Sequence, residues 1–253
     1  MELLIAREIG SAAFAPGEYV EQQSFMRAGE IRELAERAGI GPGVSVLDLC
    51  CGVAGPGRFI TRELGCDYLG VDASAGAVEI ASARARGLPC RFQVGRVPPL
   101  PAGRFDAVLL LETMLAFPDK ATLLAAVAAA LVPGGRFAFT LEAGAPLTAK
   151  ERALMPNADT VWLTPVDEMV RLLEDAGLRV TWRADVSASH RATAEALHAA
   201  YAANGPAIVA ELGAQGLEDL LTSHRLWSAW LASGRVRKLA LVAESGSDPE
   251  RRP

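Results

Sequence analysis

The part of this chain that decides its fold reads Val46-Leu47-Asp48-Leu49-Cys50-Cys51-Gly52-Val53-Ala54-Gly55-Pro56-Gly57. It is an apolar strand that runs into a turn with more glycine than packing requires. Glycine lacks a Cβ, so backbone N–H groups in such a turn can approach a ligand closely. A helix expected to begin at Gly55 would direct its positive end at the same point. The stretch therefore predicts a ligand site where the strand ends.

A second apolar run supports this interpretation. Tyr68-Leu69-Gly70-Val71-Asp72 ends in a carboxylate, about 20 residues after the glycine turn, the spacing at which nucleotide-binding α/β folds hold a ribose diol. A nicotinamide-binding Rossmann domain would share this strand, turn and acid. However, Gly52-Val53-Ala54 does not supply the G-x-G-x-x-G pattern that seats a pyrophosphate. A tight turn without a ligand is the remaining alternative.

The order of these segments resembles the class I S-adenosylmethionine-dependent methyltransferases of the small-molecule type. The resemblance continues through Phe105-Asp106-Ala107-Val108, as the start of a fourth strand, and Leu131-Val132-Pro133-Gly134-Gly135-Arg136-Phe137, as the turn into a fifth. In the first motif Asp48 and Gly52 fit the family pattern, but Cys50 and Ala54 stand where glycines are usual. We therefore expect Gly55 and Gly57 to supply the backbone flexibility that the loop would otherwise take from glycines at those two positions.

The fold class expected is α/β, with a doubly wound, mainly parallel seven-stranded sheet in the Rossmann-like methyltransferase arrangement. The resemblance implies that the last strand inserts antiparallel beside the fifth. Helices are expected over 18–38, 55–64, 77–86 and 121–131, and strands near 66–72, 90–94, 105–111, 136–141, 178–184 and 236–243. The expected division is an N-terminal helical lid (1–43), a cofactor-binding core (44–185), a helical substrate cap (186–233), the last core strand (234–244) and a disordered tail (245–253).

Composition restricts the class of partner. The 253 residues carry 25 basic and 30 acidic side chains, for a net charge of −5, without a basic run. We expect no nucleic-acid partner, because phosphate neutralisation needs clustered Lys and Arg. The exception, Arg235-Val236-Arg237-Lys238, leads into an apolar run and is interpreted as the solvent side of a strand. We expect a monomer or homodimer that acts on a small molecule.

Cysteine spacing and hydropathy suggest a cytoplasmic enzyme. The four cysteines show no C-x-x-C spacing and have no nearby histidine, so we expect reduced thiols and no metal site. The segment Met1 to Gly10 lacks the basic leader and apolar run of a signal peptide. No apolar run reaches the ~20 residues that a membrane span needs.

The resemblance implies S-adenosylmethionine as the cofactor. Asp72 would accept both ribose hydroxyls, and Asp48 would order the loop or reach the methionine amino group through water. Arg96 has no side-chain acceptor for the adenine amine, so we expect a backbone group or another residue to bind it. Tyr19, Gln22 and Gln23 are expected on the lid helix. The cofactor contacts expected are Tyr19, Gln23, Asp48, Cys50, Gly52, Asp72, Ala73, Gly95, Arg96 and Leu111.

Glu112 and His190 are the candidate catalytic residues. Glu112 follows the fourth strand, and His190 is expected in a loop after the sixth, where open α/β sheets place ligands. A histidine also suits proton acceptance near neutral pH. His224 shares a helix face with Trp227, which predicts packing as well as a place near the substrate. The substrate contacts expected are Glu112, Trp162, His190, Tyr201, His224 and Trp227.

The function expected is in-line transfer of a methyl group to an oxygen or nitrogen, with carbon as a further option, of a small metabolite or natural-product intermediate. In such a reaction the protein aligns the nucleophile, excludes water and, for a hydroxyl, accepts a proton. Two alternatives stay open. One is a cyclase of the same fold that keeps the cofactor structurally, and the other is a non-catalytic cofactor-binding subunit. Nothing in the sequence separates methyl transfer from cyclisation.

Overall fold

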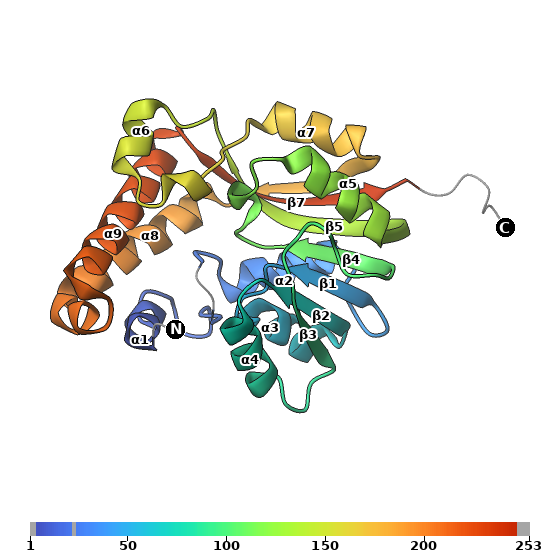
Figure 1. Cartoon of the computed structure of the whole chain (residues 1–253), viewed down its shortest axis with the longest axis horizontal. Helices are drawn as coiled ribbons and strands as arrows, with labels where there is room; N and C mark the ends of the chain where they lie inside the picture. The colour runs from blue at the N-terminus through green and yellow to red at the C-terminus, as the bar shows by residue number, and fades with distance from the viewer. Residues whose placement is uncertain (1–3, 22–23, 247–253) are drawn as a thin grey trace.

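A seven-stranded sheet in the order β3-β2-β1-β4-β5-β7-β6 forms the centre of the molecule (Figure 1). The computed structural model describes residues 4–21 and 24–246. Strand β7 runs antiparallel to its neighbours β5 and β6, and the pairs on the other side of β5 are parallel. The doubly wound sheet, with its last strand antiparallel beside the fifth, is therefore confirmed. The strands are β1 (Ser45–Leu49), β2 (Asp67–Asp72), β3 (Cys90–Val94), β4 (Phe105–Leu110), β5 (Leu131–Ala143), β6 (Leu178–Asp185) and β7 (Arg237–Ser245).

Helices cover both faces of this sheet, which explains why its central strands are apolar nearly throughout. One face packs against α5 and α7, through side chains such as Leu123 and Leu173, and the other against α2, α3 and α4, through Leu34, Ile60 and Ala81. Full burial of one such aliphatic side chain contributes about 1.5 to 3 kcal/mol. These helices are α2 (Ala28–Arg37), α3 (Gly55–Leu64), α4 (Ala75–Arg84), α5 (Lys120–Ala130) and α7 (Val166–Asp175).

Two long helices, α8 (Ser187–Ala203) and α9 (Gly205–Ser233), lie outside the sheet and extend past its edge toward α1 (Leu4–Ser11) (Figure 1). They share a small apolar core around Leu197, Tyr201 and Ile208. Helix α9 is kinked at Gly213, whose φ of 75° lies in the left-handed region, where glycine carries little steric cost. The short helix α6 (Ala149–Leu154) and the turns η1 (Met114–Ala116) and η2 (Ala158–Thr160) complete this side.

The N-terminal segment differs from expectation. A helix over 18–38 is wrong, because the described residues of that range are helical only from Ala28 to Arg37, and a separate helix α1 precedes it. The start of α2 is fixed by Glu30, whose Oε2 accepts a hydrogen bond from the Arg27 backbone N–H at 3.0 Å. Such a contact satisfies a helix-end donor and stops the helix from extending backward. Gln22, Gln23 and the tail residues 247–253 lie outside the described residues, and Ser245 is the last residue of β7.

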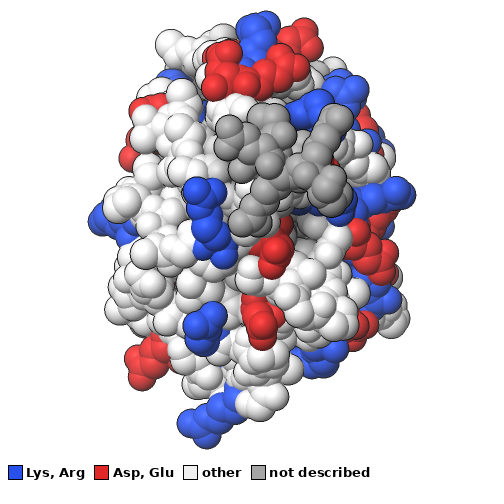
Figure 2. Space-filling model, turned by 90° about the vertical axis from the view of Figure 1, so that its right-hand side faces the viewer, with Lys and Arg blue, Asp and Glu red and all other residues white. Residues whose placement is uncertain are grey.

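The surface carries charges of both signs. On the face shown in Figure 2, acidic and basic side chains are interspersed without a continuous basic patch. Within 4–21 and 24–246, no helix combines the length and the apolar character needed to cross a bilayer.

Candidate functional site

A cavity of about 1110 Å³ opens where β1, β2 and β4 end. Its walls come from the loops after these strands, from the segment before α2 and from the inner sides of α8 and α9. Strand order reverses at β1, which lies between β2 and β4. Open α/β sheets bind ligands at such a reversal point.

The loop after β1 reaches the cavity through left-handed backbone. Cys50, Gly52 and Ala54 have φ of 58°, 53° and 55°. The two non-glycine residues therefore adopt the conformation that glycine would take in the family motif, at a cost of roughly 1 to 2 kcal/mol each. The expectation that the neighbouring glycines supply this freedom is wrong.

Gly55 and Gly57 serve close packing instead. They lie in the first turn of α3, where a Cβ on Gly55 would collide with the carbonyl oxygen of Glu21 and a Cβ on Gly57 with the ring of Tyr68. Their absent side chains allow α3 to approach both the sheet and the N-terminal segment. The N-terminal end of α3 thus lies beside the loop after β1.

Asp72 is held at the end of β2 by backbone donors. Its Oδ2 accepts from the Gly52 N–H at 2.9 Å and its Oδ1 from the Ser74 N–H at 2.8 Å. Each carboxylate oxygen can accept more than one hydrogen bond, and Asp72 lines the cavity. These oxygens fit a pair of hydroxyl donors such as a ribose diol.

Asp48 is buried below the same loop and accepts a hydrogen bond from the Tyr68 hydroxyl. Burial raises the pKa of Asp48 to about 7, against the lowering effect of that hydrogen bond, and the charge of Asp72 raises it further. Asp48 also lines the cavity, and both of its expected roles stay predictions.

The adenine side differs in detail from expectation. Tyr19, Cys50, Gly52 and Leu111 line the cavity as expected of cofactor contacts, but Ala73, Gly95 and Arg96 do not, and Arg96 is exposed. Because α4 begins at Ala75, its first turns replace them as the cavity wall. The wall residues there are Ser74, Gly76, Ala77, Glu79 and Ile80.

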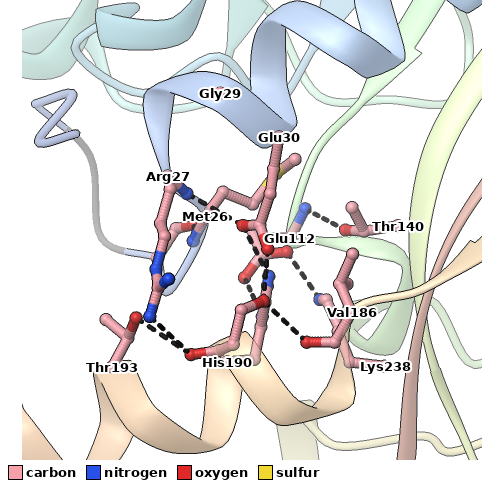
Figure 3. Close-up of polar contacts among 12 residues, drawn as sticks. Met26, Arg27, Gly29, Glu30, Glu112, Thr140, Val186, His190, Thr193 and Lys238 are labelled. Atoms are coloured by element: carbon pink, nitrogen blue, oxygen red, sulfur yellow. Dashed lines mark hydrogen bonds and ion pairs between the residues drawn. The ribbon is translucent and has the colours of Figure 1, made fainter.

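The other end of the cavity has a floor of buried charges (Figure 3). Lys238 on β7 is 2% exposed, and its Nζ lies 2.6 Å from Glu112 Oε1 and hydrogen-bonds to Glu142. Glu142 lies opposite Lys238 in the β5–β7 register. The assignment of this lysine to the solvent side of a strand is wrong, since the strand is buried on both faces. We call Glu30, Glu112, Glu142, His190 and Lys238 the charged floor; Glu30 does not itself line the cavity and joins the group through its contact with His190.

His190 lies between two carboxylates of the charged floor. It is in the first turn of α8 rather than in a loop, because α8 begins directly after β6. Its Nε2 is 3.4 Å from Glu30 Oε2 and its Nδ1 is 4.0 Å from Glu112 Oε2 (Figure 3). The residue is 0% exposed, and neither ring nitrogen makes a hydrogen bond among the described residues.

Glu112 is placed by an unusual backbone conformation. Its φ is 60°, and its N–H donates to Thr140 Oγ1 at 2.7 Å. Left-handed backbone at a residue other than glycine costs of order 1 to 3 kcal/mol and persists where its surroundings impose it. Burial alone would raise the pKa of the Glu112 carboxyl, but the charges of Lys238 and His190 hold it well below its usual value.

Apolar side chains of α8 and α9 form the remaining walls. They include Leu197, Tyr201, Leu220, Trp227 and Leu231.

His224 packs in the protein as expected, and its contact with a substrate stays a prediction. It lines the cavity, and it packs edge to face on Phe25 and Tyr201 with ring centroids 5.5 and 5.2 Å away. Trp162 was expected to contact the substrate, but it is 38% exposed and does not line the cavity. It stacks on Arg152 at 4.9 Å while its carbonyl oxygen accepts from Lys120.

Sequence reasoning missed Glu30, Glu142 and Lys238. A signal for two of them exists, since Glu142 and Lys238 each interrupt or begin an apolar run assigned to a strand covered on both faces. Charges in such strands are buried, and buried charges need partners. Pairing them still required the antiparallel register.

Known proteins resemble this chain in sequence. A family model described as a methyltransferase domain matches residues 46–135. The methyltransferase GfsG of Streptomyces halstedii is 30% identical over 208 residues, which cover 77% of this chain and 72% of that protein. The chloroplastic tocopherol O-methyltransferase of Arabidopsis thaliana is 30% identical over 117 residues, which cover 44% of this chain and 34% of that protein.

Solved structures share the fold. The cyclopropane synthase MmaA2 from Mycobacterium tuberculosis superposes with a TM-score of 0.81 at 13% identity, covering 94% of each chain. The [4+2]-cyclase SpnF superposes with a TM-score of 0.76 at 19% identity, covering 97% of this chain and 93% of that one. At these identities the likeness shows the architecture alone.

Proposed function

The chain belongs to the class I S-adenosylmethionine-dependent methyltransferases, and from this premise we propose that it methylates a small metabolite or natural-product intermediate at oxygen or nitrogen. Of these acceptors, a hydroxyl oxygen is the one that the site favours. The observation that carries this choice is His190, a buried imidazole that lines the cavity, lies 3.4 and 4.0 Å from two carboxylates and makes no hydrogen bond through either ring nitrogen among the described residues.

The cofactor end fits S-adenosylmethionine. Asp72 would hold the ribose, the left-handed loop from Cys50 to Ala54 would approach the methionine part, and the carbonyl oxygen of Leu111 would lie near its amino group. When bound, the cofactor would supply a methyl group activated on a sulfonium; the acceptor would form a bond to that carbon as its bond to sulfur breaks, releasing S-adenosylhomocysteine. The protein therefore needs to position the acceptor and take up its proton.

His190 is the proposed proton acceptor. A hydroxyl loses its proton as it attacks the methyl group, and a neutral imidazole within hydrogen-bond reach can accept it. Glu112 and Glu30 flank the ring and would stabilise the imidazolium that forms. Lys238 holds Glu112 in place without itself facing the ring nitrogens.

The helices around the cavity would exclude water from this reaction. The segment 1–43 is proposed as a lid and 186–233 as a substrate cap. Glu21 of the first segment pairs with Arg58 on α3 at 2.7 Å, which holds the segment against the cofactor loop. Phe25 contacts His224 and His190 of the second segment. Closure by both segments would keep the activated methyl group from hydrolysis.

Product mass tests the proposal. The enzyme is incubated with trideuteromethyl-labelled S-adenosylmethionine and a panel of hydroxylated metabolites, and products and S-adenosylhomocysteine are measured by mass spectrometry. Methyl transfer to oxygen gives a product that gains the labelled methyl group in place of a hydroxyl proton. A product of unchanged mass without S-adenosylhomocysteine would identify a cyclase. A product labelled at nitrogen would show that the acceptor atom is nitrogen and not oxygen.

A further inference from the structure

Charge on the floor of the cavity is not balanced. Three carboxylates, from Glu30, Glu112 and Glu142, surround one ammonium, Lys238, and the imidazole of His190. Burial by itself would raise the pKa of Glu112 and lower that of Lys238, but the attraction between them reverses both shifts. The charged floor therefore carries net negative charge even when His190 holds a proton.

Three of these side chains have buried polar atoms without a hydrogen bond among the described residues: Glu112 Oε1, Glu142 Oε2 and both ring nitrogens of His190. Glu112 Oε1 is ion-paired with Lys238 Nζ at 2.6 Å, which leaves Glu142 Oε2 and the His190 nitrogens for a ligand. Glu142 is 7% and His190 0% exposed, and both line the cavity. Buried polar atoms left unpaired are costly and uncommon. These atoms therefore indicate hydrogen-bonding groups that arrive with the acceptor.

The type of group follows from each atom. An ionised carboxylate only accepts hydrogen bonds, so Glu142 needs a donor. His190 needs a second donor, the hydroxyl whose proton it takes. Lys238, the one lysine or arginine among the described residues that line the cavity, is already paired with two carboxylates. An anionic group here would face an excess of like charge in a partly desolvated place.

We infer that the acceptor is an uncharged, amphipathic alcohol with at least two hydroxyl groups, one methylated at His190 and one donating to Glu142. Its hydrocarbon body lies against the apolar side chains of α8 and α9, among them Leu197 and Trp227. Acceptors that carry a carboxylate or phosphate on this part of the molecule are excluded by charge. The inference rests on the proposed transfer to oxygen and assigns Glu142 as a substrate-binding residue.

Binding to the full chain saturated with S-adenosylhomocysteine tests this without turnover. The probes are octane-1,2-diol, 1-octanol and octanoate, which share one chain length, and affinity is measured by calorimetry. We expect the diol to bind about 3- to 10-fold tighter than 1-octanol, the effect of one added hydrogen bond. Octanoate should bind at least ~10-fold more weakly than 1-octanol.

Glu142 variants localise the effect. Glu142→Gln removes one charge at constant shape. The affinity for octanoate should therefore rise about 5-fold or more, while the difference in affinity between the diol and 1-octanol shrinks. Glu142→Asp keeps the charge and retracts the oxygen, so discrimination against octanoate should remain and the diol should lose its advantage. Glu174→Gln, an exposed residue of α7 outside the cavity, should change none of the three affinities.

Octanoate binding as tightly as 1-octanol would overturn the inference. So would a diol with no detectable binding at its solubility limit, or Glu142 variants that leave all three affinities unchanged. Failure of the proposed function looks different. If the three probes bind in the expected order but no methylated product forms with any acceptor, methyl transfer is contradicted and the acceptor class is not. If an anionic acceptor is methylated, the acceptor class alone is contradicted.

Discussion

At the cofactor end of the cavity the contacts come mainly from one short range of the chain, residues 48–80, whereas the charged floor takes its side chains from α2, the end of β4, β5, α8 and β7. Backbone N–H groups and a helix end make up much of the first region. Mutually compensating charges make up the second. Substitution at the cofactor end therefore removes a contact, while substitution in the charged floor leaves an uncompensated charge behind.

The largest expected effect tests this contrast on stability. Lys238→Met should lower the free energy of unfolding by about 3 to 5 kcal/mol, because Glu112 and Glu142 are left buried without a cation. Denaturant unfolding at neutral pH measures it. Replacing all three residues by apolar side chains of similar size should recover most of the loss. A Lys238→Met chain as stable as the wild type would show that the floor is solvated.

The next effect falls on turnover. His190→Ala should lower kcat by ~10²-fold or more and leave the affinity for S-adenosylhomocysteine nearly unchanged, since general-base catalysis contributes ~10²- to 10⁴-fold. His224→Ala is the matched comparison in the same cavity, and it should lower the thermal midpoint because that ring packs on Phe25 and Tyr201. If His190→Ala retains full activity across the pH range, combining it with Glu112→Gln identifies whether Glu112 replaces it.

Asp72→Ala should weaken S-adenosylhomocysteine binding by about 1 to 3 kcal/mol, because two ribose hydroxyls lose their acceptor. The Gly52 and Ser74 N–H groups lose theirs as well. Calorimetry measures the loss, and Asp72→Asn, which keeps one acceptor oxygen, should fall between wild type and alanine. Affinity within about twofold of the wild type would remove Asp72 from the cofactor site.

The raised pKa of Asp48, about 7, predicts how stability depends on pH. Between the ordinary carboxyl pKa and about 7 the folded state binds a proton that the unfolded state has lost, so stability falls as pH rises through this window, by up to about 1.4 kcal/mol per pH unit. Asp48→Asn should flatten this slope and become the more stable chain above pH 7. The measurement is the free energy of unfolding from pH 4 to 8 for both chains. Equal slopes against pH in the wild type and Asp48→Asn would refute the raised pKa of Asp48.

The smallest effect belongs to Arg96. Its side chain is exposed and outside the cavity, so Arg96→Ala should change cofactor affinity by less than ~1 kcal/mol. A larger loss in calorimetry would show that the segment after β3 moves onto the cofactor.

Local patterns explain which elements could be predicted. The bounds expected for α3 and β3 coincide with the structure, and β2, β4 and β6 agree within a residue at each end. Their signals, an apolar run next to glycine or a polar break, lie within the segments themselves. The helix expected over 18–38 began too early, because the apolar spacing lies C-terminal to Glu30 and carries no signal for the helix start, which the contact of Glu30 with the Arg27 N–H fixes.

Tertiary pairing explains what could not be predicted. Asp72 is recognised from its spacing to Gly52 within one β-α-β unit, and its role at the ribose stays a prediction. Lys238 and Glu142 become partners only through an antiparallel register between segments about a hundred residues apart. Sequence spacing carries no information about such a pair.

The position of Lys238 on β7 has a consequence for the order of folding. Strands β1 to β6 emerge from the ribosome before β7, and domains begin to fold during synthesis. Until β7 inserts between β5 and β6, Glu112 and Glu142 lack the ammonium that pairs with both of them. The last strand therefore closes the sheet and completes the acceptor site in the same step, so a nascent chain that lacks it has no finished active site to expose.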